Sequence, residues 1–267
     1  MKSDFLLIER RGPVAVLTVN RPDTRNALSG EECFGAFEQV FAALNADTSV
    51  RAAVLTGAGS AFCSGGNVAE MRDRTGMFGG SPEQIAQNYR QGIQRIPRAF
   101  QTLQVPIIAA VNGAAMGAGN DLACMCDIRI ASRTARFAES FVKVGIVPGD
   151  GGCWFLPRLV GFSRAAEMAL TGETIDADEA LRTGLVSKLV EPEQLLAEAM
   201  ALALRIAANP PQVLRWTKQL LLQARTATLD EALDSAGLWQ GQAHHTADHA
   251  EAVAAFFDKR PPVFKGS

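Results

Sequence analysis

Residues 106–127 read PIIAAVNGAAMGAGNDLACMCD, and this stretch decides the fold. The apolar run 105–111 carries four β-branched side chains and predicts a buried strand. Asn112-Gly113 then turns the chain, and Gly117-Ala118-Gly119 forms a platform of small residues ahead of an apolar helix. A strand, a glycine-rich turn and a helix leave backbone N–H groups free at the positive helix end. An oxygen that carries negative charge can therefore approach them.

A carboxyl group follows this platform closely. Asp121 lies three residues after Ala118, within one helical turn of the free N–H groups. Donors that stabilise an anion, beside a group that moves a proton, form a candidate catalytic site. The same glycines can serve close packing alone, and this stretch by itself favours neither interpretation.

Composition limits the classes of function. The chain has 267 residues, 48% of them hydrophobic, and a net charge of −2, which argues against a nucleic-acid surface. No apolar run is long enough for a signal peptide or a membrane span. The five cysteines form no C-x-x-C pair, as expected of reduced thiols. We therefore expect a cytoplasmic enzyme with no membrane or nucleic-acid partner.

Neither cysteine nor histidine spacing favours a metal site. Cys124 and Cys126 have no nearby third and fourth ligand, so we expect them to pack within a helix. His245 and His249 have the i,i+4 spacing of a helical metal pair but lack a carboxylate motif, so a solvated face is the preferred interpretation. We predict no metal.

The first half of the chain alternates strands and helices. Residues 5–9 and 14–20 predict a hairpin, and 50–56 and 128–131 predict further strands. Gly57-Ala58-Gly59 follows one of these strands, but no third glycine completes a dinucleotide fingerprint.

Helices are indicated by capping and periodicity. Ser29 and Glu32 have capping-box spacing, and residues 83–104 predict one long helix bent at Pro97. Later helices are expected at 163–171, 177–183, 193–207, 211–225, 229–241 and 247–258. The prediction is an α/β core over residues 1–195 and a helical region over 196–267.

A second acid-bearing region lies at residues 136–152, RFAESFVKVGIVPGDGG. It holds Glu139 and Asp150, and Asp150 lies within a glycine-rich turn. Such a turn holds a carboxylate on a backbone free of bulk, although an aspartate that only forms the turn explains the same pattern.

Two units of the sequence share one pattern. Each unit predicts a strand, a glycine-rich turn and a helix. The units are residues 54–71 (VLTGAGSAFCSGGNVAEM) and 107–132 (IIAAVNGAAMGAGNDLACMCDIRIAS). Two backbone donors from separate loops are what an oxyanion hole requires. The two units resemble the enoyl-CoA hydratase/isomerase superfamily, whose members are also called crotonases. The resemblance extends to Asn20-Arg21-Pro22, to TGETIDADEALRTGLVSKLV at 171–190 and to AFFDKRPPVFKG at 255–266.

The resemblance implies a fold and a ligand. The fold is a crotonase-like spiral of ββα units with a C-terminal helical region that builds trimers, often paired into hexamers. The substrate is an acyl-CoA thioester, so coenzyme A belongs to the substrate and no separate cofactor is expected. The wall of the acyl pocket is expected from residues 72–100 and Trp154.

The resemblance also implies site residues. The oxyanion donors fall on the N–H groups of Gly66 and Ala118. The substrate-binding positions are Arg25, Ala27, Ser64, Gly66, Asn67, Val68 and Ala118, with Phe256 and Lys259 reaching coenzyme A from a neighbouring subunit.

One departure from the family affects the chemistry. Hydratases of the family use two glutamates; the first position is Asp121 here and the second is Phe141, which cannot transfer a proton. Asp150 is the favoured substitute over Glu139, because the glycine turn faces the acyl pocket in the family. We expect an enoyl-CoA hydratase or isomerase that uses Asp121 and Asp150. The alternatives are a hydrolase-type enzyme that uses Asp150 and a scaffold that binds coenzyme A without chemistry.

Overall fold

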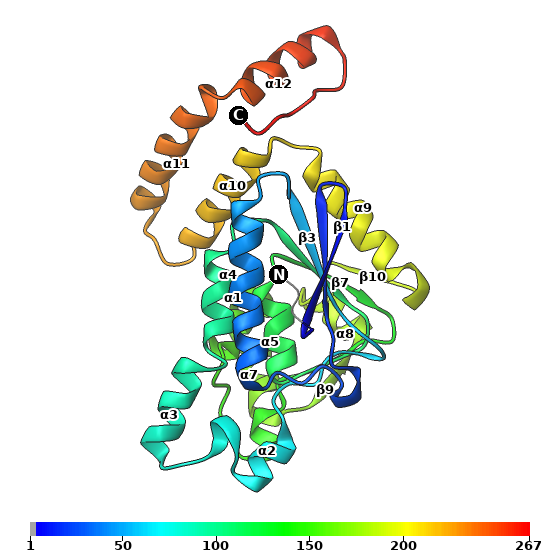
Figure 1. The fold of residues 1–267 in the computed structure, drawn as a ribbon, viewed down its shortest axis with the longest axis vertical. Coiled ribbons are helices and arrows are strands. Elements are labelled where there is room, and N and C mark those ends of the chain that lie inside the picture. The colour runs from blue at the N-terminus through cyan, green and yellow to red at the C-terminus, as the bar shows by residue number, and fades with distance from the viewer. Residues whose placement is uncertain (1–3) are drawn as a thin grey trace.

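The computed structural model describes residues 4–267 and confirms the predicted α/β architecture (Figure 1). A six-stranded sheet has the order β1-β2-β3-β5-β7-β10, and a four-stranded sheet has the order β4-β6-β8-β9. The strands are β1 (Leu6–Arg11), β2 (Val14–Val19), β3 (Ala52–Gly57), β4 (Ala61–Cys63), β5 (Ile107–Val111), β6 (Ala114–Met116), β7 (Ile128–Ser132), β8 (Arg136–Ala138), β9 (Thr174–Asp176) and β10 (Lys188–Val190).

Helices surround the two sheets. They are α1 (Gly30–Ala46), α2 (Val68–Asp73), α3 (Pro82–Gln91), α4 (Arg95–Thr102), α5 (Ala118–Met125), α6 (Gly152–Val160), α7 (Phe162–Thr171), α8 (Ala177–Arg182), α9 (Leu195–Ala207), α10 (Pro211–Gln223), α11 (Leu229–His244) and α12 (Ala247–Asp258). Short 3₁₀ helices are η1 (Pro22–Thr24), η2 (Gly76–Phe78), η3 (Ser140–Val144) and η4 (Pro192–Gln194).

The spiral of ββα units is confirmed by the way the strands divide between the sheets. β3, β5 and β7 pair in parallel in the larger sheet, and β4, β6 and β8 pair in parallel in the smaller one. Each turn of the chain thus adds one strand to each sheet and then a helical segment. This repetition brings the loops after β4 and β6 to the same edge of the smaller sheet.

Two apolar clusters hold the layers together. Phe37, Phe41 and Phe100 form edge-to-face contacts between α1 and α4, with the rings of Phe41 and Phe100 centred 4.8 Å apart. On the other side, buried alanines of α9 pack on Val14 and Val54 of the larger sheet. The predicted division after residue 195 stays a prediction, and α9 itself belongs to the packed core.

The single helix predicted over residues 83–104 is wrong. The chain breaks at Gly92 into α3 and α4, where a side chain would place its Cβ 2.6 Å from the Asn88 carbonyl oxygen and 3.1 Å from the Phe34 ring. Pro97 bends nothing, because it lies in the first turn of α4, where its missing N–H has no helical partner to lose.

Two further expectations fail locally. Ser29 stands at the N-cap of α1, but its hydroxyl forms no capping hydrogen bond. His245 and His249 do not share a helix, because α11 ends at His244 and α12 begins at Ala247. Cys124 and Cys126 are buried in and next to α5, as predicted. Across residues 4–267, no helix has the length and apolar character to cross a bilayer.

Candidate active site

The first predicted donor lies in the loop that follows β4. Its residues are held against residues 24–28: the Ser64 N–H donates to the Arg25 carbonyl at 2.9 Å, and the Leu28 N–H donates to the Gly65 carbonyl at 2.8 Å. Leu28 and Gly66 form an isolated parallel bridge. In this parallel bridge Leu28 bonds to the residues that flank Gly66, so the N–H of Gly66 is not used in pairing with Leu28.

Buried Asn26 fixes the position of Arg25 and Ala27. Its Nδ2 donates to the carbonyls of Ala58 at 2.9 Å and Ala61 at 2.8 Å, and it has a left-handed φ of 61°. Arg25 is exposed and Ala27 is buried beside the donor loop. The sequence pattern gave Asn26 no role of its own, although asparagine tolerates a left-handed backbone better than most residues.

Asn67 and Glu70 stiffen the other side of this loop. The Asn67 Oδ1 caps α2 by accepting from the N–H groups of Ala69 and Glu70, and its Nδ2 donates to the Glu70 carboxylate at 2.8 Å. The Ser29 hydroxyl donates to the same carboxylate oxygen at 2.6 Å, which explains why it does not cap α1. Val68, in contrast, is exposed.

The second predicted donor opens α5. Ala118 is the first residue of this helix, so its N–H has no partner within the helix. Gly117 before it has a φ of 51°, a left-handed value that favours glycine. A Cβ on Gly65 would lie 2.6 Å from the Met116 carbonyl oxygen and 3.4 Å from the Ala118 nitrogen. The two donor loops are therefore in direct contact.

Phe141 is buried where the family has its second glutamate. Its ring carbons lie 3.6 and 3.7 Å from the position a Cβ would take on Gly117. An apolar ring, and not a carboxyl group, thus flanks the start of α5.

Three carboxyl groups meet behind the donors. They are Asp121 of α5, Glu139 before η3 and Asp150 before α6. Their relative exposures are 0% for Asp121, 1% for Glu139 and 2% for Asp150. A Cβ on Gly152, the first residue of α6, would lie 2.0 Å from the Glu139 Oε1 and 2.5 Å from the Asp121 Oδ1. Glycine at this position makes room for the carboxyl cluster.

These carboxyl groups influence one another through their charges. The charges of Glu139 and Asp150 act on Asp121, and the charge of Asp150 acts on Glu139. Within residues 4–267, neither Asp121 oxygen meets an N–H or hydroxyl donor, and the Asp150 Oδ1 meets none either. Hydrogen bonds between carboxyl groups need a proton on one of the two partners.

Burial raises the pKa values of all three carboxyl groups, and the charges of neighbouring carboxylates raise those of Asp121 and Glu139 further. Burial, followed by the charges of Glu139 and Asp150, raises the pKa of Asp121 well above its usual range. Burial raises the pKa of Glu139 to about 7 and that of Asp150 to about 6. Near pH 7 the cluster therefore contains an acid at Asp121 and a base at Asp150.

An aromatic wall connects the donors with the carboxyl cluster. A Cβ on Gly149 would lie 2.6 Å from the ring of Tyr89, whose pKa is raised by burial and then by the charge of Asp150. The Tyr89 ring meets Phe78 edge to face, and Phe78 approaches to 3.8 Å of the Cβ position on Gly66. Tyr89 and Phe78 both belong to residues 72–100, and the prediction that this region forms the wall of the acyl pocket stays a prediction.

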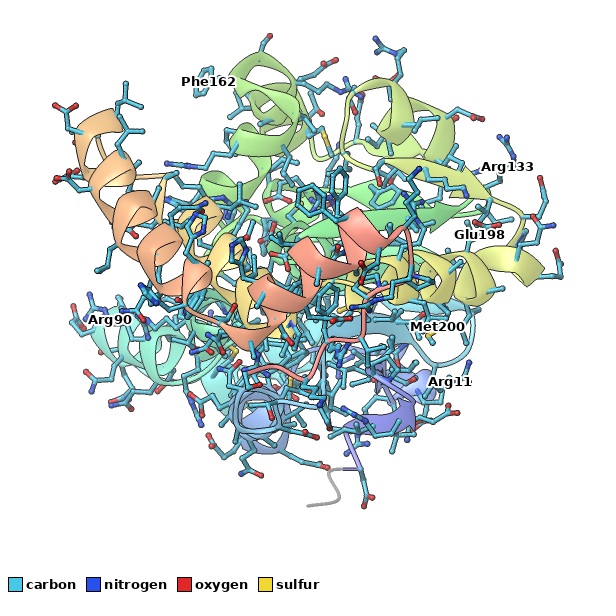
Figure 2. The ribbon with its side chains drawn as sticks, turned by 90° about the horizontal axis from the view of Figure 1, so that it is seen from above. Arg11, Arg90, Arg133, Phe162, Glu198 and Met200 are labelled. Atoms are coloured by element: carbon cyan, nitrogen blue, oxygen red, sulfur yellow. The ribbon has the colours of Figure 1, made fainter. Side chains whose placement is uncertain are left out.

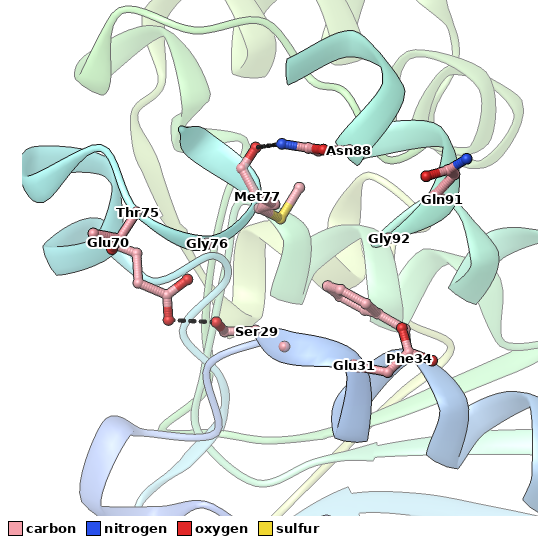
Figure 3. A pocket seen from close by; sticks show the side chains of 11 residues that line it. Ser29, Glu31, Phe34, Glu70, Thr75, Gly76, Met77, Asn88, Gln91 and Gly92 are labelled. Atoms are coloured by element: carbon pink, nitrogen blue, oxygen red, sulfur yellow. Dashed lines mark hydrogen bonds between the residues drawn. The ribbon is translucent and has the colours of Figure 1, made fainter. Parts of the chain in front are cut away.

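A pocket of about 510 Å³ lies between the start of α1 and residues of the 72–100 region (Figure 3). Met77, Asn88 and Gln91 of the 72–100 region line it together with residues at the start of α1. The carboxylates of Glu31 and Glu70 also belong to its lining, which makes it unsuitable for the phosphates of a nucleotide. Trp154 is not among its lining residues.

Phe256 and Lys259 are not brought to this site within one chain. Phe256 is 79% exposed on α12, and Lys259 ends that helix. Figure 1 shows α12 at the opposite end of the molecule from α2. In the part of the chain that the structure describes, no group of three or more histidine, cysteine or acidic side chains is placed to hold a metal.

Comparison with known proteins identifies the family. Residues 9–267 match the family model described as enoyl-CoA hydratase/isomerase. The chain belongs to this family. The enoyl-CoA hydratase/isomerase family consists of acyl-CoA enzymes, and the chain is one of them.

Relatives within the enoyl-CoA hydratase/isomerase family cover nearly the whole chain. The short-chain-enoyl-CoA hydratase of Clostridium acetobutylicum is 38% identical over 97% of each chain. The 1,2-epoxyphenylacetyl-CoA isomerase of Escherichia coli is 36% identical over 98% of this chain and 99% of its own. The solved structure of a putative enoyl-CoA hydratase from Streptomyces coelicolor has a TM-score of 0.92 and 36% identity, covering 100% of this chain and 96% of that one.

Proposed function

We propose that the protein stabilises the enolate of an acyl-CoA thioester between the N–H groups of Gly66 and Ala118, and moves protons with Asp121 and Asp150. The observation that supports this most is that α5 connects the two parts of the site: it begins at Ala118, against the Gly65 loop, and carries Asp121 into the buried carboxyl cluster. Each donor of an oxyanion hole typically contributes about 3–4 kcal/mol to lowering a barrier.

The protonation states suggest a division of labour. Asp150, with a pKa of about 6, is anionic near pH 7 and removes a proton from the activated substrate. Asp121, whose pKa is raised well above its usual range, is neutral and returns a proton to another carbon. One proton leaves the substrate and one is added, so the double bond migrates and the number of protons on the substrate does not change. The proton gained by Asp150 returns to Asp121 by transfer between the two carboxyl groups.

Hydration needs the same groups in other roles. Asp150 would take a proton from water as its oxygen attacks the β-carbon, while Asp121 protonates the α-carbon. Holding that water usually takes two acids, and Phe141 occupies the second family position. Of the two reactions, hydration and isomerisation, we therefore favour isomerisation. Both a hydratase and an isomerase occur among the relatives. The hydrolase-type and scaffold alternatives have no specific observation in their favour.

The test is an assay of crotonyl-CoA hydration and 3-enoyl-CoA isomerisation with wild type, Asp121→Asn and Asp150→Asn. We expect each substitution to lower kcat by about 10²–10⁴ while KM changes little, since proton transfer is lost and binding is retained. Glu198→Gln, a change at the surface of α9 (Figure 2) where the carboxylate pairs with Lys188, is the matched control. Full activity in both aspartate variants would rule out the assigned roles.

Self-association to a trimer or hexamer is part of the proposal. Phe162 of α7 projects from the surface (Figure 2), and Leu170, Phe256 and Phe257 are also more than three-quarters exposed. Exposed aromatic groups of this size are typical of protein interfaces. In such an assembly Phe256 and Lys259 of one subunit would reach the coenzyme A bound to another near Arg25. A monomer by analytical ultracentrifugation at micromolar concentration would contradict this.

A further inference from the structure

Glu139 has no role in the proton transfers assigned above, yet it is the third member of the carboxyl cluster. We propose that Glu139 is a positioning residue that holds Asp121 by a shared proton and keeps it in its acid form during turnover. This inference rests on the proposed function. It gives a task to a carboxyl group two residues before Phe141, the position where the family has its second glutamate.

The backbone places Glu139 against Asp121. Glu139 follows β8, which pairs with β6, and β6 leads directly into α5. The Gly117 N–H donates to the Ala138 carbonyl at 2.8 Å, which ties the residue before Glu139 to the start of α5. The Glu139 Oε1 and the Asp121 Oδ1 then converge on the position that a Cβ would take on Gly152. The contact between the two carboxyl groups is thus fixed from three elements.

Asn120 determines which of the two oxygens of Glu139 faces Asp121. Its Nδ2 donates to the Glu139 Oε2 at 3.0 Å, in a fully buried hydrogen bond. The other oxygen, Oε1, meets no N–H or hydroxyl donor within residues 4–267 and is left for Asp121. A donor on Oε2 favours the charged form of Glu139, so the shared proton resides on Asp121.

The other titratable groups around Glu139 reinforce this arrangement. Asp150 faces it from the turn before α6, and the thiols of Cys124 on α5 and Cys153 on α6 are close enough for their pKa values to be raised by its charge, after burial. A negative charge on Glu139 opposes the ionisation of Asp121, since two adjacent carboxylates repel. Asp121 consequently remains a proton donor at a pH where an isolated aspartate would be ionised.

The test is Glu139→Gln, which keeps the shape of the side chain and removes its charge. Without that charge Asp121 loses its proton at lower pH, so the alkaline limb of the kcat/KM profile moves to lower pH, by about one unit. We expect kcat at pH 8 to fall at least tenfold, with KM for the acyl-CoA substrate within about twofold of wild type. Glu139→Asp restores the charge. It should recover part of the rate and move the alkaline limb part of the way back toward its wild-type pH.

A purely structural role is separated by the same profile. Lower activity with an unmoved alkaline limb, or a wild-type rate and limb, would overturn the inference, and Glu198→Gln should behave as wild type. If Glu139→Gln does not fold, Asn120→Ser replaces it: removing the Nδ2 donor weakens the charged form of Glu139 and should move the limb the same way.

The inference and the proposed function fail in different ways. If wild type turns over no acyl-CoA substrate, the proposed function is wrong and the role of Glu139 in it is wrong too. If wild type is active and the variants leave the alkaline limb in place, the inference alone is wrong.

Discussion

The two ββα units that carry the donors share one sequence pattern and differ in burial. In the unit β3-β4-α2, helix α2 has no buried residue. In the unit β5-β6-α5, all eight residues of α5 are buried. The ends also differ, because Asn67 caps α2 with its side chain while Gly117 leaves the start of α5 uncapped.

This difference separates two tasks. An exposed helix keeps the Gly66 loop at the molecular surface, where a large ligand such as coenzyme A can reach it. A buried helix places Asp121 in a medium of low polarity, where charge is costly and the pKa of a carboxyl group rises. One pattern thus provides access in the first unit and an altered acid in the second.

The largest effect is expected from removing the exposed donor. Gly66→Pro deletes the N–H and should lower kcat by about 10²–10³, or about 3–4 kcal/mol. Gly66→Ala keeps the N–H, and its methyl group would meet the flexible end of Met71 at 3.0 Å, so most activity should remain. Steady-state kinetics on both variants decides this; equal losses would mean that the N–H is not the working group.

The second effect is on the stability of the protein and comes from Asp150 in the buried carboxyl cluster. Because burial raises the pKa of Asp150 to about 6, the folded protein binds this proton more tightly than the unfolded chain does. The stability that results is complete below about pH 4 and is lost as the pH rises through about 6. Asp150→Asn should therefore be more stable than wild type at pH 8, by up to about 3 kcal/mol, with little difference at pH 4. Urea unfolding at the two pH values measures it, and a variant less stable than wild type at pH 8 would refute the expectation.

The smallest effect is expected at the cap of the exposed helix. Asn67→Ala removes the acceptor for the N–H groups of Ala69 and Glu70 and should cost about 1 kcal/mol. The loop would also lose its bond to Glu70, so KM should rise more than kcat falls. Thermal unfolding and steady-state kinetics test both parts, with Asn209→Ala as a control away from the site.

The longer elements of the fold could be predicted from the sequence. Strands such as β5 and the helices after residue 162 carry apolar patterns long enough to be recognised. The strands β4, β6, β8, β9 and β10 have only three residues each, which is too short for a pattern to be recognised, and the glycines at its start obscure helix α6, which begins at the carboxyl cluster. Their pairing depends on contacts distant in the sequence.

The site was predictable in its positions more than in its interactions. The loop of Gly66 contacts the start of α5 at Ala118, and Asp121 and Asp150 are buried near Glu139, while the site assignment that the resemblance implied stays a prediction. What could not be predicted is which side chains meet: Glu139 joins the cluster because Gly152 lacks a side chain. A glycine in a sequence does not show which side chains approach it; that becomes clear only when its neighbours in space are known.

Tyr89 is the only tyrosine in the chain; its ring lies against Gly149 and Phe78 and feels the charge of Asp150. The nuclear magnetic resonance signals of its ring can therefore be assigned to one residue without mutagenesis. A ligand that enters between the ring and the cluster would change those signals before any bond is made or broken. The protein thus carries its own spectroscopic reporter of substrate binding.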